Sequence, residues 1–114
     1  MSKIWVMDEV ETKPGQGPAF LDAYMERYAP GNRARGLALA QVMVEPAMWL
    51  DDAPNRVLIL WEADDAGAVW AAKHQARGDE AVIRWWEEEA PAFLLSRRRS
   101  TLAPADRLEA LANV

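Results

Sequence analysis

His74 is the only histidine in the chain, which makes it the first candidate for general acid or base chemistry near neutral pH. It stands beside Lys73 and four residues after Trp70, in a segment whose apolar spacing predicts a helix ending near Arg77. The alternative is a solvent-facing or partly buried helix residue without a chemical role. One histidine cannot form a metal site alone, and the Asp and Glu residues show no ligand spacing around it. We therefore predict no metal site.

Two adjacent acidic residues, Asp8 and Glu9, are the other candidate bases. Residues 3–12 alternate as a strand does, so the two side chains point to opposite faces of a sheet. Desolvation raises the pKa of a carboxylate enclosed in a cavity, which could then accept a substrate proton. The alternative is a carboxylate that is solvated near a strand end or paired with an arginine of the run 97–99.

That arginine run lies in residues 94–102, which predict the last strand. Arg97 and Arg99 share one face of this strand and Arg98 takes the other, so at least one arginine should lie near the interior or its rim. Such a guanidinium could bind the carboxylate or enolate of a substrate. Ion pairing between subunits is the alternative.

Aromatic side chains form the third group with a potential chemical use. Tyr24 and Tyr28, four residues apart in a predicted helix, could donate hydrogen bonds or could simply pack that helix onto a sheet. Trp5 and Trp61 are predicted to share a sheet face, with its rim lined by Trp49, Trp70, Trp85 or Trp86. Large flat apolar walls suit an aromatic or hydrophobic ligand, and they suit a dimer interface equally well.

The elements that position these residues follow the order strand, helix, strand, strand, helix, helix, strand. Strands are predicted at 3–12, 37–50 with a break at Pro46, 56–63 and 94–102. Helices are predicted from Pro18 to about Arg35 with a disturbance at Pro30-Gly31, from Asp64 or Asp65 to about Arg77, and from Asp79 through 80–93. This βαββαβ order predicts an α+β, ferredoxin-like fold with an antiparallel sheet and helices on one face. Residues 1–104 form the domain, and 105–114 form a short helix-like tail.

The face of this sheet opposite the helices is predicted to be too apolar to remain in water. It would present Trp5, Met7, Gln41, Met43, Ile59 and Trp61. An exposed apolar patch of this kind marks an interface or a ligand cleft. The simplest way to cover it is a second copy of the chain in a twofold homodimer.

Composition excludes several classes of function. The chain has 114 residues, which suffices for one domain, and its net charge of −5 argues against a nucleic-acid partner. It has no cysteine, and it has no apolar run approaching the roughly 18 residues of a membrane span. The first residues lack the pattern of a signal peptide. A cytoplasmic domain is expected.

Four stretches resemble the NIPSNAP family: KPG at 13–15, FLDAYMERYAP at 20–30, NRVLILWEADD at 55–65 and WWEEEAPAFLLSRRRSTLAP at 85–104. The resemblance covers about residues 3–104. It implies the dimeric α/β-barrel (ferredoxin-like) superfamily, which also holds antibiotic-biosynthesis monooxygenase-type domains. That superfamily includes cofactor-free oxygenases, isomerases, cyclases, haem-degrading enzymes and proteins of no known activity, so the fold does not specify a reaction.

The haem-degrading members differ from this chain at the residues that matter. Their pattern pairs an Asn on the first strand with a Trp and a His on the second helix, the His ten residues beyond the Trp. Here the strand offers Asp8 and Glu9, and the residue ten positions after Trp70 is Glu80. The departure falls on the haem ligand, so we predict no haem and no other cofactor.

The sequence therefore predicts a homodimer with an aromatic-lined cavity in each subunit. The first hypothesis is a cofactor-independent enzyme that performs proton transfer or oxygenation on a hydrophobic or aromatic small molecule, with His74, Asp8 or Glu9 as base. The second is a non-catalytic small-molecule-binding or protein-interaction module. A roomy cavity with converging polar groups would favour the first, and outward arginines with a closed interior would favour the second. The residues assigned to the cavity are Trp5, Met7, Tyr24, Tyr28, Gln41, Met43, Trp61, Trp70, Trp86, Arg97 and Arg99.

Overall fold

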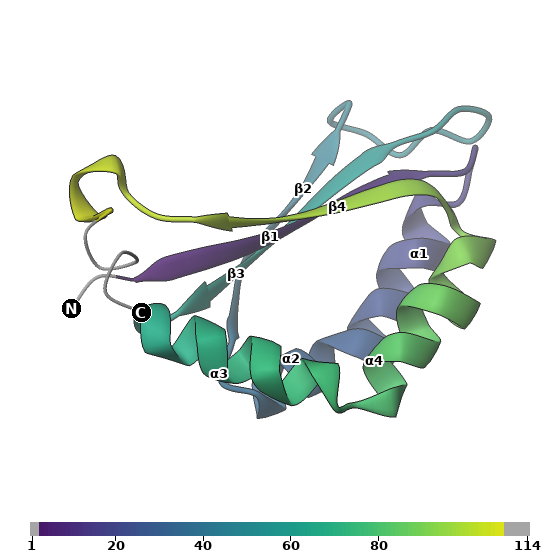
Figure 1. Cartoon of the computed structure of the whole chain (residues 1–114). Helices are drawn as coiled ribbons and strands as arrows, with labels where there is room; N and C mark the ends of the chain where they lie inside the picture. The colour runs from purple at the N-terminus through teal and green to yellow at the C-terminus, as the bar shows by residue number, and fades with distance from the viewer. Residues whose placement is uncertain (1–2, 109–114) are drawn as a thin grey trace.

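The computed structural model describes residues 3–108, which form a four-stranded antiparallel sheet with α1 to α4 on one side of it (Figure 1). The strand order is β2-β3-β1-β4, and the strands are β1 (Ile4–Thr12), β2 (Ala38–Glu45), β3 (Arg56–Ala63) and β4 (Leu94–Leu102). The helices are α1 (Gly17–Ala23), α2 (Ala29–Ala34), α3 (Ala66–Arg77) and α4 (Glu80–Arg84), with shorter helical turns at Tyr24–Tyr28, Trp85–Glu89, Ala90–Ala92 and Ala105–Arg107. Within the described residues, no helix has the length and apolar character needed to cross a membrane.

The predicted βαββαβ order and the placement of the helices on one face are confirmed. The strand predicted at 56–63 has those bounds, and β2 ends at Glu45, directly before the expected break at Pro46. The predicted tail helix is described only as the turn Ala105–Arg107, and residues 109–114 lie outside the described part.

The predicted starts of the second and third helical segments are also confirmed, and each has an aspartate cap. The Asp65 carboxylate accepts a hydrogen bond from the Ala68 N–H at 2.8 Å, which starts α3. The Asp79 carboxylate accepts from the Ala81 N–H at 2.9 Å and starts α4. A capping carboxylate satisfies an N–H group that has no partner inside the helix, so these two residues fix where each helix begins.

The two faces of β3 are the reverse of the prediction. The register pairs Val6 with Trp61 and Asp8 with Ile59, so both β3 residues lie on the helix-covered face. Trp61 and Ile59 are 0% exposed. The prediction that they share the uncovered face with Trp5 is therefore wrong, since Trp5 lies opposite Glu62.

The reason for this error is that β3 is apolar on both faces, so alternation alone could not decide which residues face the helices. Leu58 and Leu60 take the uncovered face instead, opposite Met43 and Gln41 of β2. The predicted placement of Gln41 and Met43 on that face is consistent with this register. The uncovered face thus remains partly apolar, with different β3 side chains from those expected.

Proline shapes both helical layers in the same way. Between α1 and α2 the chain widens into a π-helical turn, in which the Ala29 N–H donates to the Tyr24 carbonyl. Pro30 follows directly and has no N–H to continue the ordinary helical pattern. A second π-helical turn, Trp85–Glu89, stands in the same relation to Pro91. The disturbance predicted at Pro30-Gly31 thus extends into the preceding turn, and both π-helical turns hold buried aromatic residues.

A buried asparagine, Asn55, fixes the loop between β2 and β3. Its side-chain nitrogen donates to the carbonyls of Met48 at 2.9 Å and Glu45 at 3.3 Å, and its side-chain oxygen accepts from the Leu50 N–H at 2.9 Å. Its backbone N–H donates to the Thr12 hydroxyl at 3.0 Å. One side chain therefore satisfies several backbone groups of this loop.

We predict that Asn55→Ala lowers the free energy of unfolding by roughly 2–3 kcal/mol, because buried loop groups lose their partners. Urea denaturation followed by tryptophan fluorescence measures this. The control is Asp51→Ala, an exposed change in the same loop, with an expected effect within about 0.5 kcal/mol. Equal stability of the two variants would contradict the assigned role of Asn55.

Candidate functional site

An ion pair between β1 and β4 forms the polar centre of the core. Asp8 is 2% exposed and lies directly opposite Arg99 in the strand register. The Arg99 guanidinium donates from Nε to Asp8 Oδ1 at 2.7 Å and from Nη2 to Oδ2 at 3.0 Å. This two-point contact is the strongest and most directional pairing that a carboxylate and an arginine can make.

Two phenols and an indole extend this pair into a network. The Tyr24 hydroxyl donates to Asp8 Oδ2 at 2.6 Å, and it accepts from Trp61 Nε1 at 2.7 Å. The Tyr28 hydroxyl accepts from Arg99 Nη2 at 2.5 Å. We call Asp8, Tyr24, Tyr28, Trp61 and Arg99 the polar core cluster.

The cluster changes the acid–base properties of two of its members. Burial, and then the neighbouring charge of Asp8, raise the pKa of Tyr24 well above its ordinary value. Burial alone would lower the pKa of Arg99, but hydrogen bonds and charge from Asp8 outweigh it, so that pKa lies above its ordinary value. The phenol therefore stays neutral and the guanidinium stays charged across the physiological range.

Aromatic rings surround the cluster on the helix side. The Tyr28 ring lies 5.2 Å from Trp86 and 5.1 Å from Tyr24, measured between centroids. Phe20 contacts Tyr24 at 5.7 Å and Trp85 at 6.2 Å. These edge and tilted contacts follow the preferred geometry of aromatic pairs. The rings therefore fill the space between the helical segments 17–28 and 80–89.

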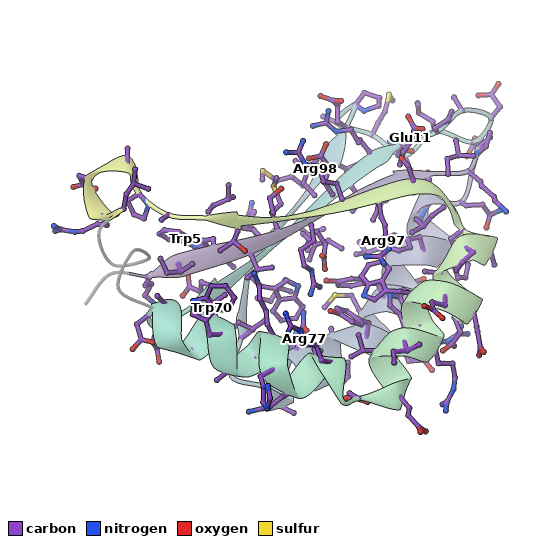
Figure 2. The ribbon with its side chains drawn as sticks, in the orientation of Figure 1. Trp5, Glu11, Trp70, Arg77, Arg97 and Arg98 are labelled. Carbon is purple, nitrogen blue, oxygen red and sulfur yellow. The ribbon has the colours of Figure 1, made fainter. Side chains whose placement is uncertain are left out.

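The arginine run divides between the two faces as predicted. Arg98 lies opposite Glu9 on the uncovered face, and Figure 2 shows Arg98 and Glu11 on one side of the sheet with Arg97 on the other. The Arg97 guanidinium stacks over the Trp86 ring at 4.3 Å from its centroid. Trp86 and Arg97, which were both assigned to the cavity, are thus in contact with each other.

A small pocket of about 20 Å³ lies beside the cluster, between the sheet and the helices. Arg99 contributes to its wall together with residues of β1, α2 and α3 and of the segment that follows α2. This volume is about that of one water molecule. Larger pockets of about 150–190 Å³ lie elsewhere and do not include Asp8 among their lining residues.

The three predicted bases occupy three different environments. His74 is exposed on α3, and Glu9 is half-buried on the uncovered face, where its carboxylate contacts Arg56 at 3.3 Å. Asp8 is enclosed, but both of its carboxylate oxygens accept hydrogen bonds from Arg99 or Tyr24. The structure therefore contains the alternative arrangement, in which Asp8 pairs with an arginine of the run 97–99 instead of serving as a free base.

The residues assigned to one cavity are divided between two sides of the sheet. Trp61, Tyr24, Tyr28 and Arg99 meet in the polar core cluster, whereas the uncovered face presents Trp5, Met7, Gln41 and Met43. The expectation that Trp5 and Trp61 line the same space is therefore wrong. Trp70 is 45% exposed on α3, with the Lys73 ammonium 4.9 Å from its ring centroid.

Two buried polar residues, Asn32 and Arg35, were not predicted to have a role. Asn32 is 1% exposed, and its side-chain oxygen accepts from Arg35 Nη2 at 2.6 Å. Asn32 lies in α2, and Arg35 directly follows that helix. From the sequence, this segment between Pro30 and Gly36 could be recognised only as an irregular helix end. Their spacing of three residues, typical of contacts along a helix, was the available signal.

In the described part of the chain, no group of three His, Asp or Glu side chains is arranged to hold a metal ion. The polar groups of the site are instead one carboxylate, one guanidinium, two phenols and one indole N–H, and they are hydrogen-bonded to one another.

Comparison with known proteins identifies the fold. No protein-family model and no curated protein matches the sequence. An uncharacterised NIPSNAP domain protein from Burkholderia xenovorans matches the structure with a TM-score of 0.68 and 17% identity, over 91% of this chain and 96% of that one. A dimeric ferredoxin-like protein from an uncultured marine organism gives 0.63 and 13% identity, over 92% and 97% of the two chains.

A third solved structure has the same architecture. A Caulobacter crescentus protein, provisionally assigned as an antibiotic biosynthesis monooxygenase, matches with a TM-score of 0.58 and 15% identity, over 91% of each chain. The chain thus has the ferredoxin-like fold of the NIPSNAP domain proteins, as the sequence resemblance implied.

We predict that Asp8→Asn lowers the free energy of unfolding by roughly 3 kcal/mol, because it leaves the Arg99 guanidinium without its counter-charge. Glu9→Gln is the matched control, being the next residue of the same strand in a more exposed ion pair, and should cost about 1 kcal/mol or less. Urea titrations of both variants make the comparison. A Glu9→Gln loss as large as that of Asp8→Asn would contradict the central position of the Asp8–Arg99 pair.

From the buried environment of Tyr24, we predict that the free energy of unfolding falls at alkaline pH. Its pKa is raised in the folded state, so the folded protein keeps the phenol proton where the unfolded chain releases it. This contribution is complete below about pH 10 and is lost above it, at up to about 1.4 kcal/mol per pH unit. Urea titrations at a series of alkaline pH values should show a steeper decline for the wild type than for Tyr24→Phe. Equal slopes would contradict the environment described for Tyr24.

Proposed function

We propose that the chain is a non-catalytic binding module of the NIPSNAP type that works as a homodimer. The observation that carries this proposal is the closed state of the interior. Both oxygens of Asp8 are engaged by Arg99 and Tyr24, and the pocket beside them holds about 20 Å³. An aromatic substrate would need many times that volume within reach of a base.

The positions of the other candidate bases support the same proposal. His74 is exposed on α3, and Glu9 lies on the face of the sheet that the helices do not cover. A general base has to come within hydrogen-bond distance of the proton that it removes, inside a site that also holds the substrate. The described arrangement therefore favours binding over proton transfer.

The uncovered face is the surface that we assign to the second copy. Its β1 and β3 positions include Trp5, Met7, Leu58 and Leu60, and Met43 of β2 is 44% exposed beside them. Burial of apolar side chains is the main favourable term in association, and homodimer interfaces are its most apolar examples.

Charges on the same face are compatible with a second copy. Lys3 contacts Glu62 at 2.8 Å, and Arg56 contacts Glu9 at 3.3 Å and Glu45 at 3.6 Å. Because these three acids already have partners within the chain, they would add little like-charge repulsion when two identical faces meet. The fold shared with a dimeric ferredoxin-like protein lends further support.

The competing proposal is a cofactor-independent enzyme that performs proton transfer or oxygenation on a hydrophobic or aromatic substrate. Its support is the fold shared with the Caulobacter crescentus protein provisionally assigned as a monooxygenase. Such an enzyme would require Asp8 to separate from Arg99, or the surrounding aromatic side chains to move apart, before a substrate could enter. Native mass spectrometry of freshly purified protein, under gentle and denaturing conditions, separates the two proposals.

The binding module predicts that a hydrophobic or aromatic small molecule keeps its mass after aerobic incubation with the protein in D₂O. Oxygenation would add oxygen to it, and proton transfer would exchange hydrogen for deuterium. A product of altered mass that forms with the wild type and with Glu9→Gln, but not with Asp8→Asn, would instead establish catalysis. The same spectra report the number of chains in the assembly.

For the homodimer, we predict that Leu60→Glu weakens self-association by roughly a hundredfold, because it places a charge in the centre of an apolar interface. Leu60 is flanked by Met7 and Gln41 on the two neighbouring strands. Sedimentation velocity over a dilution series should give a two-chain species for the wild type and a single chain for the variant. Ile83→Glu, at an exposed apolar site on α4, is the control. A wild type that sediments as one chain at every concentration would refute the homodimer.

A further inference from the structure

We propose that the pocket beside Arg99 is a binding site for a compact monovalent anion, such as a small carboxylate or chloride. The pocket is lined by Val6, Asn32, Arg35, Leu37, Val69, Ala72, Lys73, Ala76 and Arg99. Its polar side chains come from three separate elements, α2 with its C-terminal end, α3 and β4. The site is independent of the proposed homodimer, because it lies on the opposite side of the sheet.

An unpartnered amide group is the first observation that supports the site. Asn32 is 1% exposed, and its Nδ2 has no hydrogen-bond partner among the described residues. Its Oδ1 already accepts from Arg35 Nη2, which fixes the amide so that Nδ2 is the free end. A buried N–H group without a partner is unfavourable, so a ligand that accepts a hydrogen bond here recovers that cost.

The second observation is that the polar side chains around the pocket offer donors. Arg35, Lys73 and Arg99 present only N–H groups, and Asn32 has its acceptor occupied. A water molecule needs acceptors for its own protons as well as donors. An anion needs donors alone, so these side chains match an anion better than a water.

The third observation is the charge balance of the wall. Asp8 compensates Arg99, and Asp79 lies 3.3 Å from Arg35. Lys73 donates to the Thr101 hydroxyl at 3.2 Å and forms no salt bridge with any carboxylate in residues 3–108. Among the cationic side chains that line the pocket, Lys73 is thus the one without a carboxylate partner in the described residues, and its ammonium is solvent-exposed.

Size and lining define the ligand class. A volume of about 20 Å³ admits one atom group of about the size of water, such as a chloride ion or one end of a formate. The remaining wall is formed by Val and Ala side chains with Leu37, which offer no side-chain hydrogen-bonding groups. Larger anions such as sulfate exceed the volume.

The test is an NMR titration of ¹⁵N-labelled wild-type protein with sodium formate and, separately, sodium chloride. Sodium sulfate holds the ionic strength constant and serves as the anion that should not enter. We expect a saturable shift of the Asn32 side-chain amide signals with formate, with chloride or with both. Formate alone would identify a carboxylate site, and chloride alone would identify a halide site. No saturable shift with either anion would overturn the proposal and leave a water in the pocket.

Two variants test the assigned residues. Asn32→Asp retains the acceptor for Arg35 while it replaces the free N–H group with a negative charge, and it should abolish anion binding. Lys73→Gln should weaken binding about fivefold or more, as expected for loss of a partly exposed charge. Arg77→Gln is the matched control, since Arg77 lies on the same helix outside the pocket wall and should bind as the wild type does.

Anion binding that persists unchanged in Asn32→Asp would refute the site. If Asn32→Asp fails to fold, the comparison of Lys73→Gln with Arg77→Gln decides the question, followed through backbone signals of α3. Equal affinities for these two variants would then overturn the proposal.

Discussion

The ion pair between Asp8 and Arg99 is the contact on which the rest of this interior depends. It links a central strand to an edge strand, and Tyr24 attaches the first helical layer to the same carboxylate. A charge buried in a small core is tolerated only when paired and hydrogen-bonded, so the surrounding residues are constrained to supply those partners. Trp61 and Tyr28 complete that set from β3 and the first π-helical turn.

The two sides of the sheet differ in their chemical character. The helix side of the sheet is filled by aromatic rings and by a network that is satisfied from within, apart from the small pocket next to Arg99. Within residues 3–108, the opposite side has no helix over it and is apolar at Met7 and Leu60. The homodimer and the anion site that we propose use one side each.

The order of the elements along the chain and the starts of α3 and α4 could be predicted because local sequence patterns indicate them. Asp65 and Asp79 each stand directly before a helical segment, where a carboxylate caps the first N–H groups, and Pro46 lacks the N–H that would continue a strand's hydrogen bonds. The orientation of β3 could not, since its apolar residues suit either face and only pairing with β1 places Trp61 inside. The pairing of Asp8 with an arginine was anticipated as an alternative, but Asn32 and Arg35 become a pair lining a pocket only through the packing of α3.

A double-mutant cycle measures the coupling free energy between Asp8 and Arg99, using Asp8→Asn, Arg99→Gln and the combined variant. Because the two groups share a buried two-point contact, we expect a coupling free energy of about 2 kcal/mol or more in urea unfolding. The double variant should then be little less stable than either single variant. Additive losses, with a coupling near zero, would contradict the claim that this pair organises the interior.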